Sequence, residues 1–173
     1  MSELLMKLMN AFGVSGHEEE VRSLIQREIK PFVDSTEVDR MGNLIAKKNG
    51  SGREKPRIML AAHMDEIGLM VKSMDEKGRI RFSEIGGFQA INLVGHMVKL
   101  RTKDGFMEGV ITTNEISNDY DVTHIPHTRD MYIDTGLSKN ELERKGIEIG
   151  SYISFQACNT RLGSADLVCG KAL

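Results

Sequence analysis

The feature that most constrains the fold of this chain is a series of short stretches, between residues 67 and 156, in which apolar and polar residues alternate. Glycine-containing turns separate them, such as Lys103-Asp104-Gly105. Alternation with a period of two is typical of strands that bury one face, and many short strands at close spacing are typical of a small barrel or sandwich. The sequence therefore predicts a β-rich unit with strands at 67–74, 79–83, 96–102, 106–112, 131–134 and 151–156.

Helices are predicted where a capping pattern meets helical spacing. Within the β-rich unit, Ser138-Lys139-Asn140-Glu141 has the form of a capping box, and Gly146 is suited to end the helix that follows. Near the start of the chain, apolar residues at helical spacing predict a helix that stops at Gly13. Ser15-Gly16-His17-Glu18 is a second capping-box pattern, and Pro31 ends the helix that we expect after it.

Three strands are predicted before residue 67, at 35–39, 44–48 and 57–62. The last is apolar on both faces, which is typical of a central strand covered on two sides. The sequence therefore indicates an α/β unit formed by residues 1–66 and 161–173, with residues 67–160 as a separate β-rich domain. Residues 167–173 are expected to form a further strand, interrupted in mid-core.

Composition excludes several classes of partner. The formal net charge is −2, so no basic excess attracts nucleic acid or an anionic membrane. No apolar run approaches the roughly 20 residues of a membrane span, and the amino terminus has no signal-peptide pattern. Cys158 and Cys169 are too few for a disulfide framework, and we expect two buried free thiols in a reducing compartment. The predicted location is the cytoplasm.

His63 is the principal candidate for chemistry. It follows the apolar run Ile58–Ala62, and the carboxyl end of such a strand is where open α/β sheets bind ligands. Asp65 lies two residues further on, where its carboxylate could accept a hydrogen bond from one ring nitrogen. A carboxylate in that position fixes the tautomer of a metal-binding histidine and raises its basicity.

Several motifs, taken in order, resemble those of the tetrahedral (TET) metallo-aminopeptidases, some of which are labelled endoglucanase or cellulase M. Ala11–Glu18 is similar to their amino-terminal signature, and Val38–Leu44 to the next one. Leu60–Gly68 is similar to the strand that carries their first metal ligand, and Met131–Gly136 to the end of their inserted domain. Gly170–Leu173 is similar to the lead-in to their second ligand motif, so the resemblance extends over nearly the whole chain.

This resemblance implies part of a zinc-peptidase-like α/β unit with an inserted small β-barrel dimerisation domain. It implies two divalent metal ions, zinc or cobalt, and a peptide substrate from which amino-terminal residues are removed. His63 corresponds to a metal ligand, and Asp65 to the catalytic-site aspartate that orients it. The family's other ligands, including the bridging aspartate, follow the segment that matches Gly170–Leu173. The substrate-binding residues are unknown. Because the enzymes of this family form dimers that build a tetrahedral dodecamer, the resemblance also implies that this chain forms a homo-oligomer.

The remaining histidines are interpreted as structural or exposed. The best local alternative for metal binding is a polar segment that we interpret as an exposed connector, with Asp119, Asp121, His124, His127 and Asp130. His17 and His96 are expected at surface or turn positions.

Three functions are weighed on this basis. We predict a metal-dependent aminopeptidase, with the 173-residue chain inactive by itself because it lacks most of the ligands. The alternative is a non-catalytic oligomerisation module, since the β-rich unit is complete. A glycoside hydrolase is disfavoured because the chain has no Trp and no identifiable pair of carboxylates flanking a bond.

Overall fold

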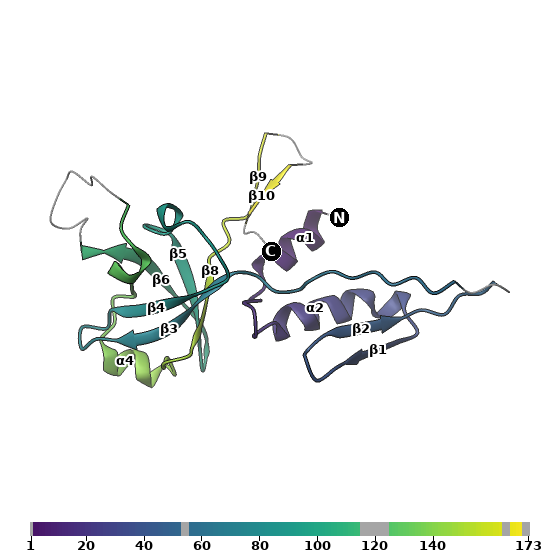
Figure 1. Ribbon diagram of the computed structural model, residues 1–173, viewed down its shortest axis with the longest axis horizontal. Helices are drawn as coiled ribbons and strands as arrows, with labels where there is room; N and C mark the ends of the chain where they lie inside the picture. Colours follow the sequence, from purple (N-terminus) through teal and green to yellow (C-terminus); the bar gives the residue numbers. More distant parts are fainter. Residues whose placement is uncertain (1, 53–55, 115–124, 164–166, 171–173) are drawn as a thin grey trace.

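A computed structural model of the chain describes residues 2–52, 56–114, 125–163 and 167–170. The fold is mixed α/β, and its main feature is a closed antiparallel barrel with strand order β3-β4-β7-β6-β5-β8 (Figure 1). The strands are β3 (Gly68–Met74), β4 (Ile80–Ile85), β5 (Met97–Thr102), β6 (Gly105–Thr113), β7 (Met131–Asp134) and β8 (Tyr152–Phe155). Each of the six predicted ranges is confirmed, with ends that differ by at most two residues.

The barrel is filled by the inward-facing residues of its strands. Leu69 on β3 and Leu100 on β5 both lie opposite Ile153 on β8, and Ile111 on β6 lies opposite Ile133 on β7. All of these side chains are fully buried. The alternation of apolar and polar residues in the sequence thus corresponds to the two faces of the sheet, because only the inward face contacts the core.

A short helix, α4 (Lys139–Arg144), packs against the barrel (Figure 1). Its predicted capping box is confirmed: Ser138 and Glu141 each bond the other's backbone amide. Gly146 follows the helix at φ +84°, a left-handed conformation that ends helices and that glycine adopts without steric cost. Leu142 and Ile147 reach the core from the two sides of this turn.

The other end of the molecule is built from helices and a hairpin (Figure 1). It contains α1 (Ser2–Asn10), α2 (Glu19–Ile29), β1 (Ser35–Val38) and β2 (Leu44–Lys47), and β1 pairs only with β2. Side chains of α2 hold the hairpin: Gln26 Nε2 donates to Thr36 Oγ1 at 3.1 Å, and Arg22 Nη1 donates to the Gly42 carbonyl at 3.0 Å. Short 3-10 turns occupy Lys30–Phe32, Ala90–Asn92 and Thr128–Asp130.

The prediction of a buried central strand at 57–62 is wrong. These residues are extended but pair with no strand among the described residues, and Ile58, Met59 and Leu60 are 80%, 87% and 94% exposed. An apolar run becomes a buried strand only when neighbours pair with its two edges and cover its faces. Here β2 pairs with β1 alone, and no described strand takes the other position.

The cysteines also differ from expectation. Cys158 and Cys169 are free, as predicted, but both are exposed rather than buried. They lie at a small two-stranded hairpin of β9 (Thr160–Arg161) and β10 (Val168–Cys169), which is separate from the barrel. A strand at 167–173 is confirmed only at Val168–Cys169, and residues 171–173 lie outside the described part.

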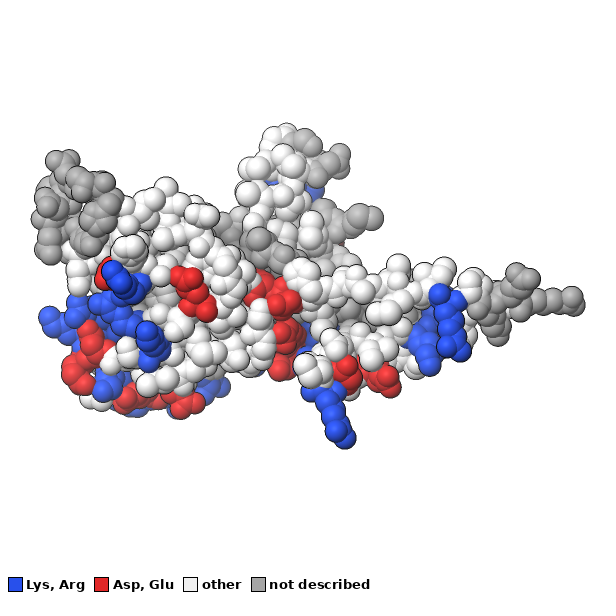
Figure 2. All heavy atoms as spheres, viewed as in Figure 1, with Lys and Arg blue, Asp and Glu red and all other residues white. Residues whose placement is uncertain are grey.

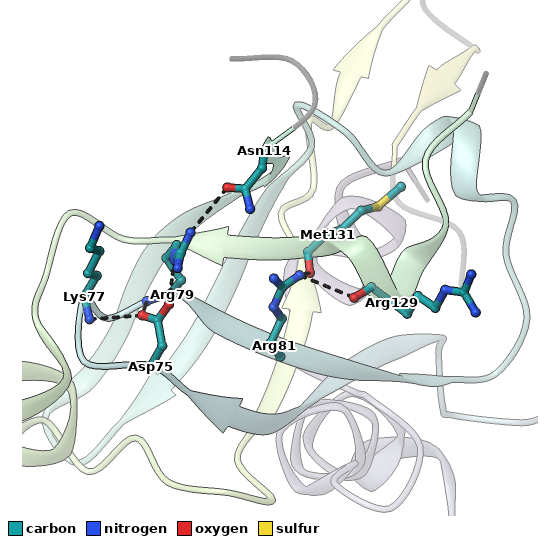
Figure 3. A network of polar contacts seen from close by, with 7 residues as sticks. All are labelled: Asp75, Lys77, Arg79, Arg81, Asn114, Arg129 and Met131. Carbon is teal, nitrogen blue, oxygen red and sulfur yellow. Dashed lines mark hydrogen bonds and ion pairs between the residues drawn. The ribbon is translucent and has the colours of Figure 1, made fainter. Parts of the chain in front are cut away.

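Charged residues of both signs gather over the barrel (Figure 2). One network joins the turn between β3 and β4 to its surroundings (Figure 3). The carboxylate of Asp75 accepts hydrogen bonds from the backbone amides of Lys77 and Arg79, both at 3.0 Å, and from Arg79 Nε at 2.6 Å. Arg81 on β4 donates to the carbonyl of Met131 at 2.8 Å.

None of the helices in the described ranges has the length and apolar character to cross a membrane.

Candidate functional site

His63 and Asp65 contact each other just before β3. Nδ1 of His63 lies 3.1 Å from Asp65 Oδ1 and 2.9 Å from the carbonyl oxygen of the same residue. The predicted contact is therefore present, although an exposed extended segment carries it and not a buried strand. With a proton on Nδ1 shared between these two acceptors, Nε2 carries the lone pair on the opposite side of the ring.

Asp65 is held from its other side by Ser15. Ser15 Oγ donates to Asp65 Oδ2 at 2.5 Å, and lies 3.2 Å from the carbonyl oxygen of Glu66. The hydrogen bond from Ser15, followed by that with His63, holds the pKa of Asp65 below its ordinary value, while partial burial acts in the opposite direction. Asp65 is thus a carboxylate whose ionised form is favoured by both neighbours.

The capping box predicted at Ser15 is therefore wrong. The Ser15 hydroxyl bonds Asp65, which is 50 residues away, and α2 begins only at Glu19 without a side-chain cap. Glu18 Oε1 instead accepts from the amide of Gly16 at 2.5 Å. Ser15 bonds this distant carboxylate in place of a helix amide, because backbone pairing holds the segment that contains Asp65 beside the amino-terminal loop.

That backbone pairing is a short parallel bridge between Val14 and Glu66. The Glu66 amide donates to the Gly13 carbonyl at 2.8 Å, and the Ser15 amide donates to the Glu66 carbonyl at 3.1 Å. The side chain of Glu66 is buried, and its Oε1 accepts from Ser154 Oγ on β8 at 3.1 Å. The segment that carries His63 is thus fixed to the amino-terminal loop and to the barrel.

Glycines permit this close approach. A Cβ on Gly68 would lie 2.6 Å from Val14 Cγ1 and 2.8 Å from the Ile153 carbonyl oxygen. A Cβ on Gly13 would lie 2.6 Å from Val21 Cγ2. Only a residue without a side chain fits at either position while the bridge keeps its geometry.

His63 fits the role of a single metal ligand. Its Nδ1 is held by a carboxylate and a carbonyl, the arrangement that orients metal-binding imidazoles, and Nε2 has no hydrogen-bond partner in the described ranges. A complete site needs more, since catalytic zinc has three protein ligands. No group of three His, Cys, Asp or Glu side chains placed to hold a metal ion occurs within the part of the chain that the structure describes.

Comparison with known proteins identifies the family. Residues 42–173 match the model of the M42 glutamyl aminopeptidases. The chain belongs to this family. A relative from Acetivibrio thermocellus, which carries a provisional name as an aminopeptidase, is 41% identical over the whole chain, and the match covers 49% of that relative.

Two solved structures are similar to this chain in fold as well as in sequence. The aminopeptidase APDkam598 of Desulfurococcus kamchatkensis is 35% identical and superposes with a TM-score of 0.86 over 94% of this chain and 45% of its own. The TET1 peptidase of Pyrococcus horikoshii is 34% identical, with a TM-score of 0.80 over 94% of this chain and 48% of its own. That peptidase can assemble into a tetrahedron or a large octahedral shell. The chain thus spans about half the length of these relatives.

Only some of the other candidate residues lie in the described part of the chain. Asp119, Asp121 and His124 are outside the described residues, whereas His127 is exposed beside the 3-10 turn that contains Asp130. His96 is exposed and packs edge-on against Phe155.

His17 is partly exposed and directly follows a turn, as expected, but it also contacts the barrel. Its ring stacks on Tyr152 at 5.1 Å between centroids, and its Nε2 lies 2.8 Å from Arg101 Nη1. It therefore links the start of α2 to the barrel. Sequence reasoning missed Ser15 and Glu66 as parts of the site, and neither has a local pattern that indicates a partner so distant in the chain.

Proposed function

We propose that this chain forms the amino-terminal half of a metal-dependent aminopeptidase that removes amino-terminal residues from peptides. His63 is the ligand that this half supplies, and Asp65 orients its imidazole. The observation that carries the proposal is the contact of His63 Nδ1 with Asp65, in a chain of the M42 glutamyl aminopeptidase family. This contact leaves Nε2 without a hydrogen-bond partner among the residues that the structure describes.

The remaining ligands are proposed to come from the part of the relatives' length that this chain does not span. Two divalent metal ions, zinc or cobalt, polarise a scissile carbonyl and activate water when bound in such sites. The role of the chain's own residues is narrower. The amino-terminal loop and Glu66 hold the His63 segment in place, and Asp65 keeps the proton of the imidazole on Nδ1.

Homo-oligomerisation is part of the same proposal. The P. horikoshii TET1 peptidase superposes on almost the whole chain and builds closed shells, and the barrel supplies a self-contained unit suited to contact a second copy. A cytoplasmic location and the inactivity of the chain alone remain predictions. The alternative is a non-catalytic assembly role, and a test of peptidase activity distinguishes it from catalysis.

The test compares the 173-residue chain with a chimera in which it is joined to the carboxyl-terminal half of the A. thermocellus relative. Both are assayed with Zn²⁺ or Co²⁺ on amino-acid p-nitroanilides. We expect no turnover by the chain alone and turnover by the chimera, which His63→Ala abolishes by removing one metal ligand.

His127→Ala is the matched control, because it removes an exposed imidazole from the barrel surface and should leave the rate unchanged. Turnover by the chain alone that survives His63→Ala would refute the assignment of His63. A folded chimera that never hydrolyses an anilide or a peptide would favour the assembly role.

A further inference from the structure

We propose that Ser15 is the positioning residue of this site: its hydroxyl holds the Asp65 carboxylate in the one orientation from which it can bond His63. The inference rests on the proposed function, because it gives Ser15 a purpose only if His63 acts as a ligand. It concerns a residue that does not touch substrate or metal, and that acts through Asp65.

The Asp65 carboxylate needs a hydrogen-bond donor to orient it because it is accessible to water. Its side chain is 42% exposed, so packing alone does not select a rotamer. The two oxygens are instead divided between two partners: Oδ1 faces His63 Nδ1 at 3.1 Å, and Oδ2 accepts from Ser15 Oγ at 2.5 Å. With both oxygens engaged on different sides, rotation about either side-chain bond breaks at least one hydrogen bond.

Ser15 is itself rigidly placed. Its amide donates to the Glu66 carbonyl, and Val14 beside it is completely buried and bridged to Glu66. Glu66 in turn is tied to β8 through Ser154. The hydroxyl of Ser15 is therefore attached to a fixed backbone. A hydrogen-bond donor that is fixed in this way restricts the orientation of the Asp65 carboxylate, whereas a mobile water molecule does not.

The restriction matters for the imidazole. The Asp65 carbonyl also faces His63 Nδ1, at 2.9 Å, so the tautomer has a second support. The carboxylate adds negative charge beside the ring, an arrangement that strengthens metal binding by an imidazole. Loss of the Ser15 hydroxyl should therefore loosen the carboxylate first and weaken metal binding as a consequence.

The experiment measures the two effects separately in the 173-residue chain. Three-bond couplings from the Asp65 Cγ to its backbone nitrogen and carbonyl carbon report the rotamer, without any metal. Co²⁺ titration, followed by paramagnetic broadening of the His63 ring signals, reports the dissociation constant. We expect one rotamer for the parent chain and Ser15→Thr, and averaged couplings for Ser15→Ala with Co²⁺ binding weakened on the order of 10-fold.

Ser138→Ala is the matched control, because Ser138 Oγ also lies within hydrogen-bond distance of a carboxylate, that of Glu141 at 2.6 Å, in another part of the fold. It should leave the Asp65 couplings and Co²⁺ binding unchanged. A single Asp65 rotamer in Ser15→Ala, or equal averaging in Ser138→Ala, would overturn the proposal. If Co²⁺ fails to broaden His63 in the parent chain, His63 does not hold the ion by itself, and the couplings still decide the role of Ser15.

Discussion

Ser154 on β8 donates its hydroxyl hydrogen to Oε1 of Glu66, 88 residues earlier in the chain, at a distance of 3.1 Å. The same carboxylate oxygen lies 3.4 Å from the amide of Gly13 and accepts its hydrogen. Glu66 is only 4% exposed. One buried side chain thus connects the barrel, the segment that carries His63 and the amino-terminal loop.

Truncation of this side chain should destabilise the protein. Glu66→Ala removes the buried carboxylate oxygen that accepts from both the Ser154 hydroxyl and the Gly13 amide, which costs about 1–3 kcal/mol of unfolding free energy. Urea denaturation followed by circular dichroism measures the loss. Glu66→Gln keeps an acceptor oxygen and should lose less, and Glu84→Ala on the exposed face of β4 should stay within about 0.5 kcal/mol. Equal midpoints for Glu66→Ala and Glu84→Ala would contradict this role.

The turn between β3 and β4 depends on a glycine. Gly78 has φ +81°, and a Cβ there would lie 1.8 Å from the carbonyl oxygen of Leu137. Strain and the steric clash together predict that Gly78→Ala loses about 2–4 kcal/mol. Gly87→Ala is the matched control, because nothing lies within 4 Å of its Cβ position, and it should change stability by no more than about 1 kcal/mol. Thermal unfolding of the two variants compares them, and similar melting temperatures would disprove the requirement.

Acid should weaken the protein partly through Asp75. Partial burial acts to raise the pKa of Asp75, but the hydrogen bonds from the Arg79 backbone and side chain outweigh it and leave the pKa lowered from 3.8. A carboxyl whose pKa is lower in the folded state stabilises that state when ionised. Its contribution is therefore present above the unfolded value and is lost as the pH falls through the folded one.

The corresponding variant is Asp75→Asn, which cannot ionise. We expect it to be less stable than the parent at neutral pH, and the difference to shrink as the pH falls below about 3.8. Urea unfolding over a pH series measures both slopes. A difference that stays constant across the series would mean that the charge of Asp75 does not contribute.

The strands of the barrel could be predicted because each carries its own signal. Alternation fixes which face of β6 is buried, and the Ser138–Glu141 pattern is satisfied by residues three apart, so both are local properties of the chain. The partner of Ser15 was not predictable in this way. Its hydrogen bond to Asp65 depends on the parallel bridge between Val14 and Glu66, which are 52 residues apart, and the sequence offers no local sign of this bridge.

Residues 57–62 show the opposite limit. Their composition is that of a buried strand, but a strand exists only through its neighbours, and the described chain provides none. The exposed cysteines illustrate the same dependence, since a residue's intrinsic tendency to be buried says nothing about whether a given hairpin is covered.

The exposed apolar tract should make the 173-residue chain self-associate. The tract exposes the apolar side chains of Ile58, Met59 and Leu60 on an extended backbone that pairs with no described strand. It therefore combines a hydrophobic surface with an open edge. Met59→Glu with Leu60→Glu should raise the monomer fraction in light scattering. Ile149→Glu, at a residue 72% exposed on the barrel, should not. A parent chain that is already a monodisperse monomer would refute the expectation.

Limited proteolysis tests the proposed division at residues 67 and 160. The closed barrel has its own core, whereas the stretch around Lys48 and Arg57 is exposed and outside any strand. Trypsin should therefore cut first at these basic residues and leave a resistant fragment that contains β3 to β8. Mass spectrometry of the fragments identifies the sites. Cleavage that begins within the barrel strands would contradict the division.

Because β8 runs antiparallel to β3 and closes the ring, the chain comes into the barrel and departs from it at adjacent points: Leu69 lies opposite Ile153. Everything between these points behaves topologically as a loop whose two ends are already together. Such an arrangement lets the barrel lengthen, shorten or change its outer surface over evolution without moving the flanking segments. The geometry around His63 and the surface presented by the barrel can then diverge independently.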